Sequence, residues 1–151
     1  MGPSPFGDGK MIKYEKLPAD ILSRIPDVKR ILMEDRNIVF AYLFGGLTKS
    51  EVKPFSDVDL AVYIREKDQL AEYKLRLFDK MTQTLGTSEL DLIILNNAPV
   101  SLTGRILQTR QVLVDKDPPF RHAYESLILR EFFDFKMKED LLLSRRYGTG
   151  R

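Results

Sequence analysis

Apolar residues along the chain repeat at two different spacings. Helical spacing alternates with short runs of β-branched and aromatic residues, which are typical of buried strands. The helical pattern covers residues 17–36, 67–85, 100–107 and, from Pro118 or Pro119, a long stretch to about Leu143. The strand pattern covers residues 38–44, 58–64, 90–95 and 111–114. Because the two patterns are interleaved, the sequence predicts an α/β (α+β) fold in which helices pack on a small mixed β-sheet.

Three positions refine the helical segments. Pro26 lies inside the first one, where a proline removes a backbone N–H and crowds the preceding turn, so a break is expected there. Gly86 follows the second and can adopt the left-handed conformation that ends many helices. The last helix has an apolar stripe that is expected to be mostly core: Phe120, Tyr124, Leu127, Ile128, Phe132 and Phe135. Phe133 lies off this stripe, which predicts an exposed side chain and a surface for a partner.

The chain has 151 residues, a length typical of one domain. Residues 1–10 are rich in Gly and Pro and have no apolar stretch, so we interpret them as a flexible leader rather than a signal peptide. Residues 11–143 are expected to form the single domain. Residues 144–151 carry three arginines and no acid, and we expect them to form a disordered basic tail.

Composition narrows the functional classes. The formal net charge is only +2, so no basic field indicates a nucleic acid or a membrane as partner. The absence of cysteine excludes disulfides and thiolate zinc sites. No apolar run approaches the roughly 20 residues that span a bilayer. These features favour a cytoplasmic protein.

Two aspartates open the second predicted strand. Alternation puts Asp57 and Asp59 on one face of the strand and the apolar Val58 and Leu60 on the other. The two carboxylates, roughly 6–7 Å apart along the strand, repel each other unless a cation lies between them. Magnesium prefers oxygen ligands, commonly one or two carboxylates together with substrate phosphates. The pair therefore indicates a metal site, with solvated or capping aspartates as the alternative.

Asp91 is the candidate for a third carboxylate. It interrupts the apolar strand 90–95, where a buried and unpaired carboxylate would carry a large desolvation cost. A neighbouring cation would remove that cost, so we expect Asp91 to join the metal site. Glu89 lies on the same strand face and is the rival, although it is nearer the end of the strand and more easily solvated.

The pair Gly45-Gly46 ends the first predicted strand and precedes a stretch that can form a short helix. Glycines there let an anion approach the backbone, and the amide N–H groups at the start of a helix can hold a phosphate. Thr48, Lys49 and Ser50 add two hydroxyl donors and a cation. The sequence therefore predicts a phosphate site at this turn, and an ordinary tight turn is the alternative.

These residues together resemble the nucleotidyltransferase fold of the DNA polymerase beta superfamily. Residues 44–46 read FGG, and after a gap of about ten residues the chain reads SDVDLAV over residues 56–62. The small size and this second phrase are most similar to the minimal nucleotidyltransferases (MNT) of bacteria and archaea. The resemblance runs from about Leu17 to Phe135. Most minimal members have Gly-Ser, whereas this chain has Gly46 at the serine position, and Lys49 is all that remains of an arginine-rich continuation.

The resemblance implies roles for the candidate residues. Asp57 and Asp59 would bind two Mg²⁺ ions, and Asp91 would be the third carboxylate, which helps to activate the attacking hydroxyl. The triphosphate of ATP would lie along the glycine turn, on Gly45 and Gly46. The phosphate contact of the missing serine would then come from the backbone or from Thr48 or Ser50.

The resemblance also implies an activity and a partner. Minimal members commonly pair with a small helical HEPN protein as a toxin–antitoxin system, in which AMP passes from ATP to a tyrosine of the HEPN ribonuclease. Two other functions stay open at this point: AMP transfer to a small molecule, and an antitoxin that binds its partner without catalysis. Nucleic acid is not required for any of these, and self-association into a homo-oligomer stays open.

Overall fold

The computed structural model describes residues 18–48 and 57–147 of the chain. The four α-helices within these ranges are α1 (Ile21–Glu34), α2 (Leu70–Leu85), α3 (Val100–Thr109) and α4 (Pro118–Tyr147). The four strands are β1 (Ile38–Phe44), β2 (Val58–Ile64), β3 (Leu90–Ile94) and β4 (Gln111–Asp115). Two short 3₁₀ helices follow strands: η2 (Gly45–Thr48) after β1 and η3 (Leu95–Asn97) after β3. Every predicted helix and strand is therefore present, with boundaries that differ by a few residues.

The four strands form one mixed sheet in the order β3-β2-β1-β4. The pairs β1–β2 and β1–β4 are antiparallel, whereas β2–β3 is parallel. The parallel pair needs a crossover, and α2 supplies it by returning the chain to the starting end of the sheet. The predicted mixed sheet is thus confirmed, with β1 and β2 at its centre and β3 and β4 at its edges.

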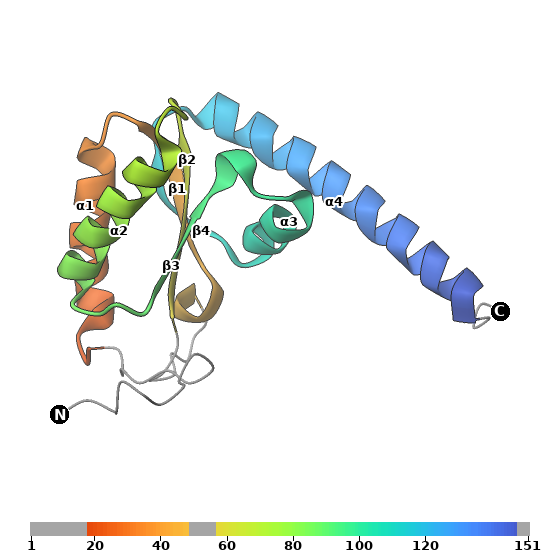
Figure 1. The fold of residues 1–151 in the computed structure, drawn as a ribbon, viewed down its shortest axis with the longest axis horizontal. Helices are drawn as coiled ribbons and strands as arrows, with labels where there is room; N and C mark the ends of the chain where they lie inside the picture. The colour runs from red at the N-terminus through yellow and green to blue at the C-terminus, as the bar shows by residue number, and fades with distance from the viewer. Residues whose placement is uncertain (1–17, 49–56, 148–151) are drawn as a thin grey trace.

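Helices cover both faces of the sheet (Figure 1). On one face α1 and α2 pack over an apolar cluster that includes Val28, Leu32 and Met81, all fully buried. On the other face α3 and the first half of α4 pack over a cluster that includes Phe40, Tyr42 and Ile106. Alternation along each strand sends its side chains to these two clusters in turn, which is why β1 is buried on both sides.

The predicted break in the first helix is wrong, because α1 continues through Pro26. A proline at this position cannot donate to the carbonyl of Leu22, four residues earlier. Leu22 is 55% exposed, so water can reach that side of the helix and solvate the carbonyl. Gly86 ends α2 as predicted: it adopts a left-handed φ of +74°, and its N–H donates to the Thr82 carbonyl at 2.9 Å.

The last helix is longer and less buried than the sequence predicts. It extends to Tyr147, so residues 144–147 of the expected tail are helical; residues 148–151, like the leader 1–10, lie outside the described ranges. Within the apolar stripe Phe132 is buried, but Phe120, Leu127 and Phe135 are exposed. The second half of α4 runs past the sheet and α3 (Figure 1), so its apolar side chains have no core to enter. Phe133 is 56% exposed, as predicted.

None of the helices in the described part of the chain combines the length and the apolar composition that a membrane span requires.

Candidate functional site

The glycine turn begins directly where β1 ends. Gly45 has a φ of +74°, a conformation that costs glycine little and other residues much more. The Thr48 hydroxyl donates to the Gly45 carbonyl at 2.7 Å and closes the short η2 turn. The Gly45 N–H donates at 3.0 Å to the hydroxyl oxygen of Thr109, the last residue of α3. The turn is therefore fixed both from within and from α3.

Gly45 also makes room for a carboxylate. The antiparallel register of β1 and β2 pairs Phe44 with Asp59, so the turn and the start of β2 lie side by side. A Cβ atom added to Gly45 would collide with Oδ2 of Asp59. The glycine turn and the aspartate, which the sequence suggested as parts of one site, are thus in direct contact. A side chain at position 45 would displace the Asp59 carboxylate.

Asp59 and Asp91 are partners in the parallel register of β2 and β3. Residues paired in this way direct their side chains to the same face, and neighbouring strands are roughly 4.8 Å apart. Leu60 and Leu92 belong to the apolar cluster under α1 and α2, so the two aspartates lie on the α3/α4 face of the sheet. Asp57 directly precedes β2 and is half-buried, one alternation step from Asp59.

The expectation that Asp91 is buried is wrong, because its side chain is exposed. β3 is an edge strand, and Asp91 is its second residue. Asp91 therefore needs no cation to remove a burial cost. Its register with Asp59 is the stronger reason to place it in the candidate site.

The carboxylates fit a hard divalent cation by donor type and by position on one face. Oxygen ligands of this kind suit Mg²⁺, which usually keeps waters and shares its other ligands with substrate phosphates. Within the described residues, no group of three or more His, Cys, Asp or Glu side chains could hold a metal ion. An ion at these carboxylates would need further ligands, such as the phosphate oxygens of a nucleotide.

The remaining predicted phosphate ligands divide into two groups. Gly46 and Thr48 belong to η2, although the Thr48 hydroxyl proton already has an acceptor in the Gly45 carbonyl. Lys49 and Ser50 lie outside the described residues. Thr109 was not predicted, because nothing in its sequence neighbourhood connects it to a turn 64 residues away.

A buried ionic network fixes the helices behind this turn, and it was also not predicted. Glu125 of α4 is 5% exposed and accepts hydrogen bonds from three side chains. The Tyr42 hydroxyl of β1 donates at 2.6 Å, Arg121 of α4 at 2.7 Å, and Arg110 at 3.0 and 3.1 Å. Arg121 also bonds to Asp115 at 2.8 Å. The one signal in the sequence is the spacing of Arg121 and Glu125, which puts both on one helix face.

Charge and burial oppose each other at Glu125. Burial by itself would raise the pKa of this carboxyl, but the hydrogen bond from Tyr42 and the charges of Arg121 and Arg110 outweigh it and hold the pKa below its ordinary value. Burial and the adjacent carboxylate raise the pKa of Tyr42, so its hydroxyl stays protonated and donates. Glu125 is therefore ionised at neutral pH and joins α4, β1 and Arg110, the residue that follows α3.

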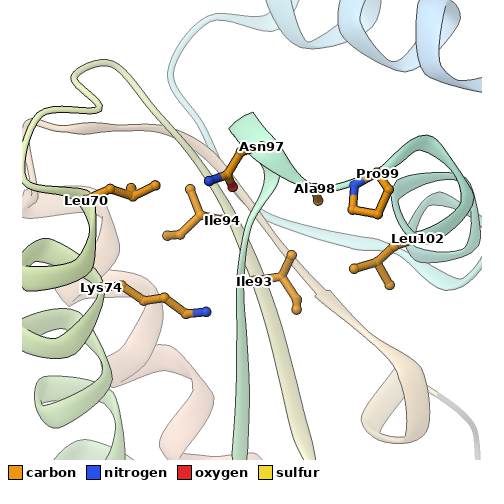
Figure 2. Close-up of a pocket in the computed structure, with 8 residues that line it drawn as sticks. All are labelled: Leu70, Lys74, Ile93, Ile94, Asn97, Ala98, Pro99 and Leu102. Atoms are coloured by element: carbon orange, nitrogen blue, oxygen red, sulfur yellow. The ribbon is translucent and has the colours of Figure 1, made fainter.

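A separate groove of about 220 Å³ lies at the outer edge of β3, between α2 and α3 (Figure 2). Ile93 points toward α3 and Ile94 toward α2, and Lys74 is the one charged side chain in its lining. The groove contains none of the three aspartates. It is thus distinct from the glycine turn and its carboxylates, which form the candidate site.

Comparison with known families decides what kind of site this is. Residues 27–119, which include β1, the glycine turn, all three aspartates and Thr109, match the family described as "Polymerase beta, Nucleotidyltransferase". The chain belongs to this family. The nucleotidyltransferase class and fold implied by the FGG and SDVDLAV motifs are therefore confirmed. Comparison with curated protein sequences finds no match.

Several solved structures share the nucleotidyltransferase fold of the chain at low sequence identity. A mutant of the toxin–antitoxin MntA–HpeT matches with a TM-score of 0.65 and 16% identity, over 83% of this chain and 97% of that chain. A toxin–antitoxin with AMP-PNP matches with a TM-score of 0.64 and 17% identity, over 83% and 97%. The tri-AMPylated HEPN toxin of Shewanella oneidensis in complex with MNT antitoxin gives a TM-score of 0.60 and 16% identity, over 84% and 96%.

Proposed function

We propose that the chain is a Mg²⁺-dependent nucleotidyltransferase that transfers AMP from ATP to the hydroxyl of a protein, a tyrosine of a HEPN ribonuclease toxin. The observation that carries this proposal is the contact between Gly45 and Asp59, with Asp91 in register beside it. A glycine turn that a phosphate can approach, two carboxylates at the start of β2 and a third acid on the same face are what phosphoryl transfer needs for positioning and charge neutralisation.

In this proposal each residue of the site has one role. Gly45 and Gly46 would leave the backbone open to the triphosphate, and Thr48, Lys49 and Ser50 would be its side-chain ligands. Asp57 and Asp59 would hold two Mg²⁺ ions, which neutralise phosphate charge when bound. Asp91, the exposed member of the three, would orient the acceptor hydroxyl or take its proton. The hydroxyl oxygen attacks the α-phosphorus, the bond between the α- and β-phosphates breaks, and pyrophosphate leaves.

Two similarities support the nucleotide and the acceptor. One structure that shares the fold is a toxin–antitoxin with AMP-PNP, an ATP analogue. Another contains a tri-AMPylated HEPN toxin together with an MNT antitoxin. The shared fold, together with the glycine turn and the carboxylates of this chain, favours the same chemistry here.

The second half of α4 favours a protein acceptor over a small molecule. Six large apolar side chains between residues 133 and 143 are 43–71% exposed on a helix that runs past the rest of the fold. They are Phe133, Phe135, Met137, Leu141, Leu142 and Leu143. Apolar surface of this extent marks a protein contact more often than a small-molecule site. We therefore place the partner, rather than a small substrate, against this part of the molecule.

The proposal is tested by removing the metal-binding carboxylates. Asp57→Asn and Asp59→Asn keep the size of the side chains but remove their charge, so AMP transfer should fall below about 1% of the wild-type rate. Transfer is measured as the radioactive label that α-³²P-ATP leaves on a HEPN protein. This protein is encoded in the same genome and is expressed together with the chain. The control Asp79→Asn changes an exposed aspartate of α2 and should keep full activity.

Thermal unfolding of the variants separates loss of chemistry from loss of fold. Both site variants should keep a cooperative thermal transition, because asparagine has the size and shape of aspartate. Undiminished labelling by the double variant Asp57→Asn/Asp59→Asn would disprove the proposed mechanism. A wild-type chain that binds the HEPN protein tightly but shows no calorimetric response to Mg-ATP would instead indicate an antitoxin that acts by binding alone.

A further inference from the structure

Among the described residues, Thr109 is the one outside the family motif whose polar side chain is bonded to the glycine turn. Its hydroxyl oxygen accepts the Gly45 N–H at 3.0 Å, and its side chain is exposed. We propose that Thr109 is a phosphate-binding residue of the nucleotide site, and that its hydroxyl replaces the serine hydroxyl that Gly46 lacks. This inference rests on the proposed function, because it concerns the triphosphate of the same site.

The hydrogen-bond inventory of the turn singles out Thr109. A hydroxyl has one proton to donate and can accept as well. The proton of the Thr48 hydroxyl goes to the Gly45 carbonyl at 2.7 Å, so that donor is committed to closing η2. The Thr109 hydroxyl accepts from Gly45, and among the described residues nothing accepts its own proton. An exposed hydroxyl proton beside a backbone turn is suited to a phosphoryl oxygen.

Gly45 brings this hydroxyl close to the carboxylates. The same glycine donates its N–H to Thr109 and leaves space for Oδ2 of Asp59. The two groups could bind one metal-bound phosphate together. The Thr109 hydroxyl would donate to a phosphoryl oxygen, and the Asp59 carboxylate would hold the cation. The Thr109 hydroxyl thus lies at the same glycine as the carboxylate of Asp59.

The end of α3 is held firmly enough to define the position of this hydroxyl. Arg110, the next residue, donates to the Leu107 carbonyl at 2.6 Å and to both oxygens of the buried Glu125. Glu125 in turn accepts from Tyr42, three residues before Gly45 on β1. Both partners of the bond between Gly45 and Thr109 are therefore anchored to one carboxylate, which favours a fixed ligand over an incidental surface contact.

The experiment measures phosphate affinity in variants of the full chain by calorimetry, with Mg-ATP and with Mg-tripolyphosphate as probes. Thr109→Val keeps the shape but removes the hydroxyl, and we expect affinity for both probes to fall about tenfold or more. Thr109→Ser keeps the hydroxyl and should stay within about twofold of wild type. Gln108→Ala, a change at the exposed neighbour on α3, should have no effect.

The decisive variant is Gly46→Ser/Thr109→Val, which supplies a hydroxyl at the motif position. The φ of Gly46 is not positive, so serine can adopt the backbone conformation of this position. We expect the double variant to regain most of the lost affinity, although the Gly45 N–H stays without its partner. A purely structural role for Thr109 predicts no such recovery, because a serine at position 46 does not replace the lost acceptor of the Gly45 N–H.

The outcomes separate this inference from the proposed function. If wild type binds Mg-ATP and Thr109→Val binds it equally well, or if Gly46→Ser fails to restore binding, Thr109 is not a phosphate ligand and the proposed function stands. If wild type itself binds neither Mg-ATP nor Mg-tripolyphosphate, both proposals are wrong.

Discussion

Two helices cover each face of the sheet, but the side chains buried on the two faces differ in chemical type. Under α1 and α2 the contacts are apolar: Val28, Leu32 and Met81 are fully buried among aliphatic strand residues. Under α3 and α4 the core is aromatic, with Phe40 and Tyr63 stacked at 5.1 Å, and it contains the ionised Glu125. The candidate carboxylates lie on this second face as well.

This difference separates stability from function. An apolar face stabilises the fold without constraining direction, because apolar burial is non-directional. An ionic network adds little net stability but fixes geometry, since each bond requires a defined angle and distance. The site and its anchors lie together on the α3/α4 face, which implies that changes on the α1/α2 face should lower the free energy of unfolding and leave nucleotide affinity intact.

The strongest test of this separation is Leu32→Ala in α1. Leu32 is fully buried, so the substitution leaves a cavity and should lower the free energy of unfolding by about 4 kcal/mol. Affinity of the folded fraction for Mg-ATP should match wild type within about twofold, since the cavity and the site lie on opposite faces. Urea unfolding followed by far-UV circular dichroism gives the first quantity, and calorimetry the second. A large loss of affinity per folded molecule would show that the faces are coupled.

A change on the other face should affect stability and site together. Glu125→Gln keeps the shape but removes the carboxylate partner of Arg110 and one of the two carboxylate partners of Arg121, which should cost about 3 kcal/mol. Because Arg110 follows Thr109 directly, the bond between Thr109 and Gly45 should also loosen. Chemical denaturation measures the first effect, and the exchange rate of the Gly45 amide in NMR measures the second. If the Gly45 amide exchanges at the wild-type rate in the variant, the Glu125 network does not hold the turn in place.

The same variant provides a control for pH dependence. The pKa of Glu125 is lower in the folded chain than in the unfolded chain, where a glutamate has a pKa of about 4.3. Its contribution is therefore complete above about pH 5 and is lost as the pH falls through the folded-state value. Wild type should lose stability relative to Glu125→Gln below about pH 4.3, and the two curves should run parallel between about pH 6 and 8.

The smallest effect on stability should come from the projecting half of α4. Met137 is 71% and Leu141 56% exposed, so Met137→Ser/Leu141→Ser should change the free energy of unfolding by no more than about 0.5 kcal/mol. Affinity for the HEPN protein should nevertheless fall by about tenfold or more, because apolar anchors carry much of an interface. Lys138→Gln, between the two positions, is the matched control. A variant with unchanged affinity would place the interface elsewhere.

The sequence was sufficient to predict the elements and their facing. Alternation along 58–64 assigned every residue of β2 to the correct side, and the run 38–44 has the predicted bounds. These predictions succeed because they depend on neighbours in the chain. Pro26 shows the limit of such local rules, since α1 continues through it although a proline cannot make the helical hydrogen bond.

What the sequence could not predict depends on contacts between distant segments. Asp91 was assigned to the site for the wrong reason, because strand order alone decides that β3 is an edge and that its carboxylate reaches water. Thr109 and the partners of Glu125 depend on how α3 and α4 cross the sheet. The apolar pattern of α4 likewise gave no indication of where the supporting fold ends, so Phe135 and Leu127 were assigned to the core.

The parallel pairing of Asp59 with Asp91 restricts where insertions and deletions can be accepted during evolution. Deleting or inserting one residue within β2 or β3 would turn one carboxylate to the opposite side, since side chains alternate with a period of two. The connections before and after α2 carry no such constraint and can lengthen freely. In an alignment of relatives, gaps should therefore fall beside α2 and never inside β2 or β3. The length of these two strands should be more constant than the identity of most of their residues.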